Sequence, residues 1–111
     1  MGFSRAVRVG QHVFVAGTAP VMPEGEELPS DAYGQTKRCL EIIVAALEQA
    51  GAKPEDVVRT RIFATSAGIF EEVARAHGAV FGAAKPACTF VITELIDPRW
   101  HVEIEAEALV Q

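Results

Sequence analysis

The stretch that decides the fold is KPACTFVITELIDPRWHVEIEA, residues 85–106. It predicts two β-strands joined by a short turn that contains proline. The second strand alternates, because side chains of a strand point to opposite faces with a period of two. One face is polar and contains His101, Glu103, Glu105 and Glu107. The other face is aliphatic and contains Val102, Ile104, Ala106 and Ala108. Three carboxylates on one face repel one another, so we expect a functional site there or a basic neighbouring strand.

The N-terminal part of the chain predicts a hairpin followed by a loop. Short strands are expected at residues 4–9 and 12–17, on either side of the turn residues Gly10 and Gln11. Residues 18–30 are rich in Pro, Gly and Glu, and this composition favours a solvated connection over an ordered lid.

Two amphipathic helices are predicted next. The first begins after Ser30 and Asp31, whose side chains can accept free N–H groups of a first helical turn, and it ends before Gly51. Its inward face is expected to contain Thr36, Leu40, Ile43, Val44 and Leu47. The second helix follows a break at residues 66–68, and its inward face is expected to contain Phe70, Val73, Ala74, His77 and Phe81. We interpret His77 as a satisfied core histidine rather than a catalyst.

A third strand is predicted at residues 57–65, between the helices. One face is expected to contain Arg59, Arg61 and Phe63. The other is expected to contain Val58, Thr60 and Ile62. The order of elements is therefore β-β-α-β-α-β-β. Two amphipathic helices need a sheet face to bury against, so we predict an α+β fold, a two-layer sandwich forming one domain over residues 1–111. The other sheet face mixes apolar and charged residues and is expected to meet another subunit.

The composition narrows the classes of function. The formal net charge is −5 and the 10 Lys and Arg residues are scattered, whereas binding to a phosphate backbone needs a basic patch. We therefore expect no nucleic-acid partner. The two cysteines, Cys39 and Cys88, lie far apart in no metal-binding motif, so we predict a reduced cytoplasmic protein without a metal site or a cofactor. No apolar run approaches the length of a membrane span.

The same C-terminal stretch resembles a known family. A Pro-Ala-Arg-Ser/Thr strand followed by a strand ending in Ile/Val-Glu-Ile-Glu-Ala is the signature of the Rid family (reactive intermediate deaminases, also called YjgF). The segment VFVAGTAP at residues 13–20 extends the resemblance over nearly the whole chain. The resemblance implies a chorismate-mutase-like subunit, a homotrimer and ligand clefts between the subunits. It also implies deamination of small imines or enamines.

One position departs from the family pattern. The family's arginine, which the resemblance implies grips a substrate carboxylate with its planar fork, corresponds to Cys88 here. Cys88 is interpreted as a small buried apolar residue, with a neutral pocket wall and a reactive nucleophile as alternatives. Other cleft positions of the family are also apolar here, namely Phe3, Ala16, Ala74 and Phe90. Such a pocket favours a neutral or apolar ligand, since unpaired polar groups are costly to bury.

Glu103 is the remaining catalytic candidate. It matches the first glutamate of the family's last strand, where the resemblance implies that a carboxylate orients or deprotonates the water that attacks an imine carbon. An ion pair with Arg59 or Arg61 on a neighbouring strand is the alternative, and the two interpretations carry equal weight.

The sequence leaves alternatives for the residues at the mouth of the cleft and for the function. Trp100 either caps a cleft or, as we favour, shields the sheet edge. Arg5 and Arg99 are the cations expected near the mouth, and either is available to replace the missing arginine. Two functions follow. One is a homotrimer that binds a small metabolite without standard 2-imino acid deamination. The other is a hydrolase acting on an imine or enamine of a different small reactive metabolite.

Overall fold

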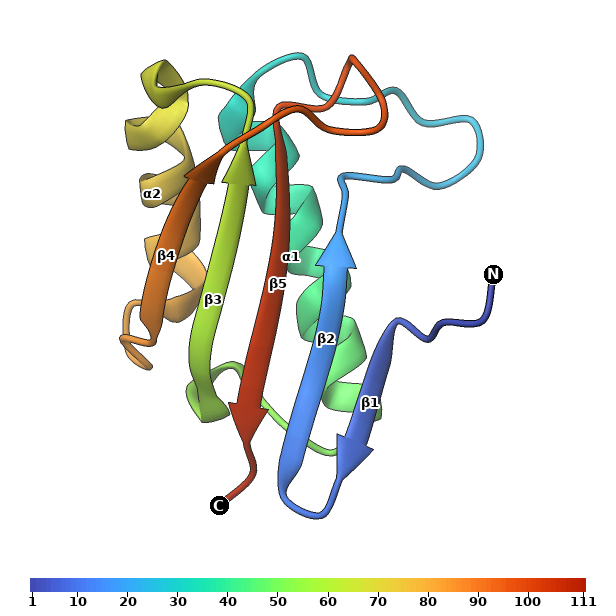
Figure 1. Cartoon of the computed structure of the whole chain (residues 1–111), viewed down its shortest axis with the longest axis vertical. Coiled ribbons are helices and arrows are strands. Elements are labelled where there is room, and N and C mark those ends of the chain that lie inside the picture. The colour runs from blue at the N-terminus through green and yellow to red at the C-terminus, as the bar shows by residue number, and fades with distance from the viewer.

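The two helices pack side by side against one face of a five-stranded sheet and leave the other face open (Figure 1). The arrangement comes from a computed structural model that describes residues 1–111. The strands and α-helices are β1 (Ala6–Val9), β2 (His12–Thr18), α1 (Ala32–Gln49), β3 (Val57–Ala64), α2 (Phe70–Phe81), β4 (Ala87–Ile92) and β5 (Val102–Leu109). The predicted α+β class and order of elements are therefore confirmed.

The last strand of the chain is the centre of the sheet. The strand order is β1-β2-β5-β3-β4, so β5 lies between β2 and β3 and is antiparallel to both. β4 runs parallel to β3, because α2 carries the chain back across the sheet between them. Because β4 is last in the strand order, it is an edge strand with a neighbour on one side only.

The alternation of β5 separates the core from the open face as predicted. Val102, Ile104 and Ala108 are 0% exposed, whereas the glutamates between them are partly exposed. The buried side chains of β5 belong to one core cluster with the inward face of α1, which includes Leu40, Ile43 and Leu47. The helix signals are confirmed as well: Asp31 accepts the backbone N–H of Gly34, and Gly51 follows the helix end with a φ of 84°.

The predicted inner face of β3 is wrong at its first residue. The register between β3 and β5 shifts between Val57 and Arg59, so that Val57 is buried and Val58 is 45% exposed. An extra residue of this kind interrupts the alternation of a strand. Beyond the shift, Thr60 and Ile62 face the helices as expected.

The predicted inner face of α2 is too wide. Val73 and Phe81 are buried, but Phe70 is 52% exposed and Ala74 is exposed, while Ala76 is buried instead. The helix packs mainly against α1 and buries only a narrow stripe.

Replacing Ile104 by alanine tests the central position of β5. Ile104 is 0% exposed, so Ile104→Ala should lower the free energy of unfolding by about 2–5 kcal/mol, through lost burial and the cavity left behind. Ile96 is 94% exposed, and Ile96→Ala should cost less than about 0.5 kcal/mol. Urea unfolding followed by circular dichroism measures both. Equal losses in the two variants would contradict the central position of β5 in the core.

Candidate functional site

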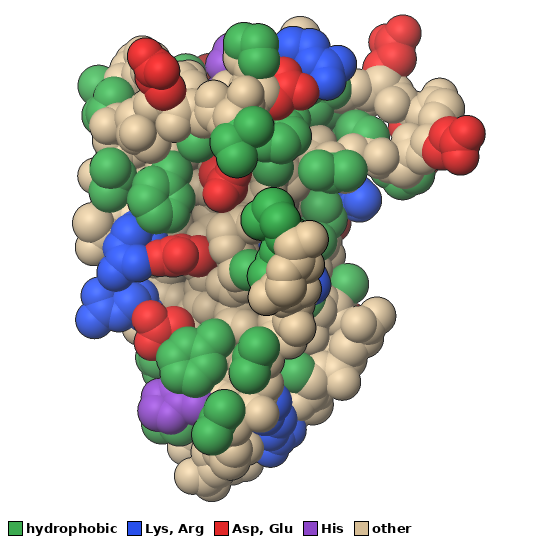
Figure 2. All heavy atoms as spheres, turned by 45° about the vertical axis from the view of Figure 1, so that its right-hand side comes forward, with side chains coloured by type: hydrophobic (Ala, Val, Ile, Leu, Met, Phe, Trp, Pro, Cys, Tyr) green, Lys and Arg blue, Asp and Glu red, His purple; other side chains and the backbone are tan.

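Charged side chains pair across the open face between β3 and β5. The register places Arg59 opposite Glu107 and Arg61 opposite Glu105. The Nε atom of Arg59 lies 4.0 Å from a carboxylate oxygen of Glu107, and Arg61 forms a hydrogen-bonded ion pair with Glu105. Basic and acidic side chains lie in contact on the molecular surface (Figure 2). A basic neighbouring strand thereby compensates two of the three glutamates of β5, which is one of the two outcomes that the sequence left open.

The third glutamate, Glu103, has no such partner. It lies opposite Phe63 in the register, and its carboxylate takes part in no ion pair or hydrogen bond within the chain. The two arginines of β3 are already paired, so the alternative that Glu103 pairs with one of them is wrong. The carboxylate lies against the backbone of Gly17, where an added Cβ atom would come within 2.6 Å of its Oε2 atom. Glycine at residue 17 is therefore required for the carboxylate to lie where it does.

Glu103 lines a cavity of about 540 Å³. Five parts of the chain form its wall: the segment before β1, the end of β2 with the following loop, α1, the loop before β5, and β5 itself. The lining residues are Phe3, Arg5, Gly17, Thr18, Ala19, Val21, Met22, Pro23, Arg38, Ile42, Ile96, Trp100 and Glu103. Of the residues predicted from the sequence, the cavity brings together Phe3, Arg5, Trp100 and Glu103.

The loop after β2 is part of this wall rather than only a solvated connection. Pro20 is buried, and the carbonyl oxygen of Val21 accepts a hydrogen bond of 2.7 Å from Nε of Arg38. The longest exposed run of the loop is residues 23–27, and Val21 and Ser30 are exposed as well. The first part of the loop is therefore held in place by a contact with α1, to a residue 17 positions further along the sequence.

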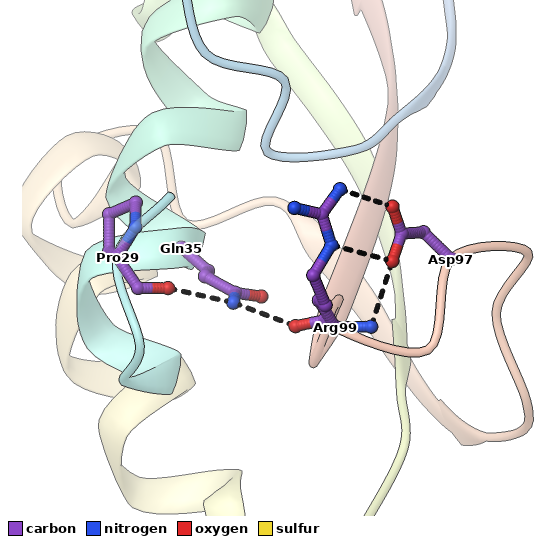
Figure 3. Close-up of polar contacts among 4 residues, drawn as sticks. All are labelled: Pro29, Gln35, Asp97 and Arg99. Carbon is purple, nitrogen blue, oxygen red and sulfur yellow. Dashed lines mark hydrogen bonds and ion pairs between the residues drawn. The ribbon is translucent and has the colours of Figure 1, made fainter. Parts of the chain in front are cut away.

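The cations of this region are engaged with other groups. Arg5 donates from Nη1 to the carbonyl oxygen of Gly17 at 2.9 Å and to Oγ1 of Thr18 at 2.8 Å. Arg99 is clamped by Asp97, with Nη2 and Nε at 2.7 and 3.1 Å from the two carboxylate oxygens (Figure 3). Hydrogen bonds from Arg99 lower the pKa of Asp97, and the same interaction raises the pKa of Arg99. Arg99 lines a neighbouring cavity, not the one that contains Glu103.

Arg38 is a cavity residue that the sequence analysis missed. The helical pattern places it on the outer face of α1, but its side chain turns under the loop after β2 and also lies 3.5 Å from Glu41. Nothing in the local sequence distinguishes it from Lys37 beside it, which is exposed. The acceptor that draws Arg38 inward is a backbone carbonyl 17 residues away.

Cys88 and Phe90 lie on the helix side of the sheet, opposite to Glu103. In the parallel register Cys88 is beside Thr60 and Phe90 is beside Ile62, and both partners face the helices. Phe90 packs edge-to-face on the ring of Phe70, with centroids 5.1 Å apart. Cys88 is exposed, so its interpretation as a buried apolar residue is wrong for the isolated subunit. The reason is its position on an edge strand, which the local sequence does not reveal.

The remaining predicted positions lie apart from the cavity. Ala16 lines a separate hollow of about 270 Å³ on the open face, together with Phe14 and the paired arginines of β3. Ala74 is exposed on α2. One subunit therefore does not assemble all the positions that the family resemblance associates with one cleft.

Two titratable side chains in the interior are structural. The Nε2 atom of His77 is 2.9 Å from Oγ1 of Thr60, its ring packs on Phe81, and burial lowers its pKa. The hydrogen bond agrees with the interpretation of His77 as a satisfied histidine, although its side chain is only partly buried. Burial raises the pKa of the Cys39 thiol to about 12, with a further contribution from the negative charge of Glu103. A neutral, buried thiol of this kind is unreactive.

Comparison with known proteins identifies the family and agrees with the fold. Residues 1–110 match the Endoribonuclease L-PSP family. A RutC family protein of Pyrococcus abyssi is 37% identical over 107 residues, which cover 96% of this chain and 84% of the relative. The 2-iminobutanoate/2-iminopropanoate deaminase of Escherichia coli K12 is 30% identical over 110 residues, covering 96% and 86% of the two chains. A crystal structure of a YjgF family member from Mycobacterium tuberculosis is 44% identical with a TM-score of 0.88, covering 98% and 87%.

The chain belongs to the Rid/YjgF family, as its C-terminal signature indicated. No helix has the length and apolar character needed to cross a membrane. No three His, Cys, Asp or Glu side chains come together in a way that could hold a metal ion.

The two thiols should differ sharply in reactivity. Cys88 is exposed, whereas Cys39 is buried with its pKa raised to about 12, so a disulfide reagent at pH 8 should modify one thiol per folded chain. The absorbance of the released thiolate measures the count and the rate. In Cys88→Ser no fast reaction should remain until denaturant is added, and Cys39→Ser should react like the wild type. Fast labelling of folded Cys88→Ser would show that Cys39 is accessible.

Proposed function

We propose that this chain forms a homotrimer that binds a small metabolite in clefts between its subunits and is a poor deaminase of 2-imino acids. The observation that carries the proposal is the unpaired carboxylate of Glu103 in the wall of an otherwise largely apolar cavity. A carboxylate without a partner in its own chain is available to a donor group of a ligand or to a water molecule.

The surface of the subunit supports assembly. Val7, Val9 and Phe14 lie on the open sheet face and are 49%, 65% and 44% exposed. Apolar groups that gather on one face favour contact with another protein surface. In one subunit Cys88 and Glu103 lie on opposite faces of the sheet, so a site that uses both positions needs two copies of the chain.

The state of the arginines argues against an ordinary 2-imino acid as substrate. Such a substrate brings a carboxylate into a partly enclosed cleft, and the Cys88 thiol supplies no bidentate cation. Arg5 and Arg38 line the cavity, but each is engaged with backbone carbonyl groups, and Arg99 is clamped by Asp97. Leaving one charge of a buried pair without its partner costs about 3–5 kcal/mol. That corresponds to roughly two to four orders of magnitude in binding.

A second function is favoured by the same free carboxylate, namely hydrolysis of an imine or enamine that carries no carboxylate. Glu103 would take a proton from water as the water oxygen bonds to the imine carbon. Glu103 then returns that proton to the nitrogen, which gives a carbinolamine; as the hydroxyl proton also moves to the nitrogen, the C–N bond breaks, and ammonia leaves with a carbonyl product. The named deaminase activity of the Escherichia coli relative supports this chemistry for the family.

Cleavage of RNA is not the function we propose, although the matching family is described as an endoribonuclease. The net charge is −5, and the close pair Arg59 and Arg61 is neutralised by glutamates of β5. These two arginines therefore form no free basic surface that could bind a phosphate backbone.

The proposed assembly predicts a single species of three times the 11.9 kDa subunit mass. Multi-angle light scattering at micromolar concentration measures it. Phe14→Glu replaces an exposed apolar side chain of the open face with a carboxylate and should shift the protein toward smaller species, because burying an unpaired charge between subunits is costly. Glu48→Gln, on the exposed side of α1, is the control. A wild-type monomer under these conditions would remove the shared cleft.

Release of ammonia distinguishes the two proposed functions. A freshly generated 2-imino acid should show little or no release above the buffer rate with the wild type, because its carboxylate finds no partner. Cys88→Arg alone should not restore full activity, since Phe3, Ala16 and Ala74 still lack polar groups. An imine generated from benzylamine by an amine oxidase carries no carboxylate. Its hydrolysis by the wild type, lost in Glu103→Ala, would establish the second function.

Glu48→Gln serves again as the control for a change of charge away from the cavity. If neither imine is hydrolysed faster than in buffer, binding without catalysis remains as the function. Efficient turnover of the 2-imino acid by the wild type that disappears in Glu103→Ala would overturn the argument from the missing arginine. Arg5→Ala would then identify whether that cation holds the carboxylate.

A further inference from the structure

Gln35 is a buried amide that joins the two loops of the cavity wall. It lies on α1 and is 1% exposed. Its Nε2 atom donates to the carbonyl oxygens of Pro29 at 2.9 Å and Arg99 at 3.0 Å (Figure 3). Its Oε1 atom accepts the backbone N–H of His101 at 2.7 Å. The bonds to residues 99 and 101 span 64 and 66 residues of sequence.

The hydrogen bonds from Gln35 to Arg99 and His101 hold the residues on either side of Trp100. The carbonyl group before it and the N–H group after it both meet the amide of Gln35, as they would meet a neighbouring strand. Two further contacts hold the same segment: Nε2 of His101 lies 3.0 Å from the carbonyl oxygen of Ser30, and the N–H of Thr65 donates to the carbonyl oxygen of His101 at 3.0 Å. The backbone on both sides of Trp100 is thereby fixed to α1 and to the residue after β3.

Trp100 lines two hollows of the molecule. It lines the cavity of about 540 Å³ that contains Glu103 and the neighbouring cavity of about 260 Å³ beside Leu28 and Arg99. A displacement of the indole would therefore change the shape of the space in front of Glu103. The favoured sequence interpretation, a shield of the sheet edge, is incomplete, because the residue also forms cavity wall.

We propose that Gln35 is a positioning residue whose amide sets the place of Trp100 and so the shape of the ligand cavity. The assignment of this cavity to a ligand rests on the proposed function, whereas the placement of Trp100 does not. An amide suits the task because one side chain offers both donor and acceptor groups. Removing it leaves the partly buried backbone groups of residues 99 and 101 without these partners, and such groups then bond to other partners or to water.

The emission of Trp100 reports its placement directly, because it is the only tryptophan of the chain. In Gln35→Leu, without ligand, emission should shift to longer wavelength and acrylamide should quench it more strongly. Far-ultraviolet circular dichroism should stay unchanged. Gln49→Glu, on the exposed side of the same helix, should match the wild type in all three measurements. Unchanged emission and quenching in folded Gln35→Leu would overturn the proposal.

Gln35→Glu provides an independent test if Gln35→Leu fails to fold. The ionised carboxylate still accepts from His101 but repels the carbonyl oxygens of Pro29 and Arg99. Once protonated it can donate to one of them. Its emission should therefore return toward the wild-type spectrum as the pH is lowered, with no such trend in Gln49→Glu. A spectrum identical to the wild type at every pH would contradict the positioning role.

The imine generated from benzylamine separates this inference from the proposed function. If the wild type hydrolyses it, Gln35→Glu should raise KM more than it lowers kcat, because the wall moves while Glu103 stays on β5. Glu103→Ala should show a different pattern, in which kcat and kcat/KM fall by the same factor. If no variant binds or hydrolyses the imine but Trp100 still moves, the proposed function fails and the placement by Gln35 stands.

Discussion

The strict alternation of β5 is the constraint on which the structure depends. The strand is central, so its register is set on both sides, by β2 and by β3. A slip by one residue would turn three glutamates into the core and expose the aliphatic face, which is prohibitive because buried unpaired charge is costly. With the register fixed, Glu105 and Glu107 meet arginines, and Glu103 is left opposite Phe63. The free carboxylate of the site is thus a consequence of the fold.

A local irregularity of β2 completes the site. The register between β2 and β5 shifts between Val15 and Thr18, and Gly17 lies within this shift. Bulges of this kind bend a strand and redirect neighbouring groups, and they occur often beside active sites. Here the missing side chain at Gly17 leaves room for the Glu103 carboxylate. The cavity therefore begins where the regular pairing of the sheet ends.

The parts of the structure that sequence could predict are those set by local periodicity. The faces of β5, the cap at Asp31 and the end of α1 at Gly51 follow from neighbours a few residues away. The inward turn of Arg38 depends on a backbone group 17 residues away, and the bonds of Gln35 to residues 99 and 101 span 64 and 66 residues, so no local sequence pattern predicts them. The exposure of Cys88 followed from strand order, and the exposure of Val58 from a register shift. Both are tertiary features.

The separation of Cys88 from Glu103 gives a physical reason why, as we propose, Cys88 can replace the arginine of the family pattern while Glu103 is kept. Glu103 lies on the most constrained strand, beside a glycine that fits its carboxylate. Cys88 lies exposed on an edge strand, where a substitution away from packed groups changes stability little. In the proposed trimer the two positions come from different copies of the chain. In the proposed cleft, the position that the family resemblance associates with carboxylate binding can therefore change without disturbing the strand that carries Glu103.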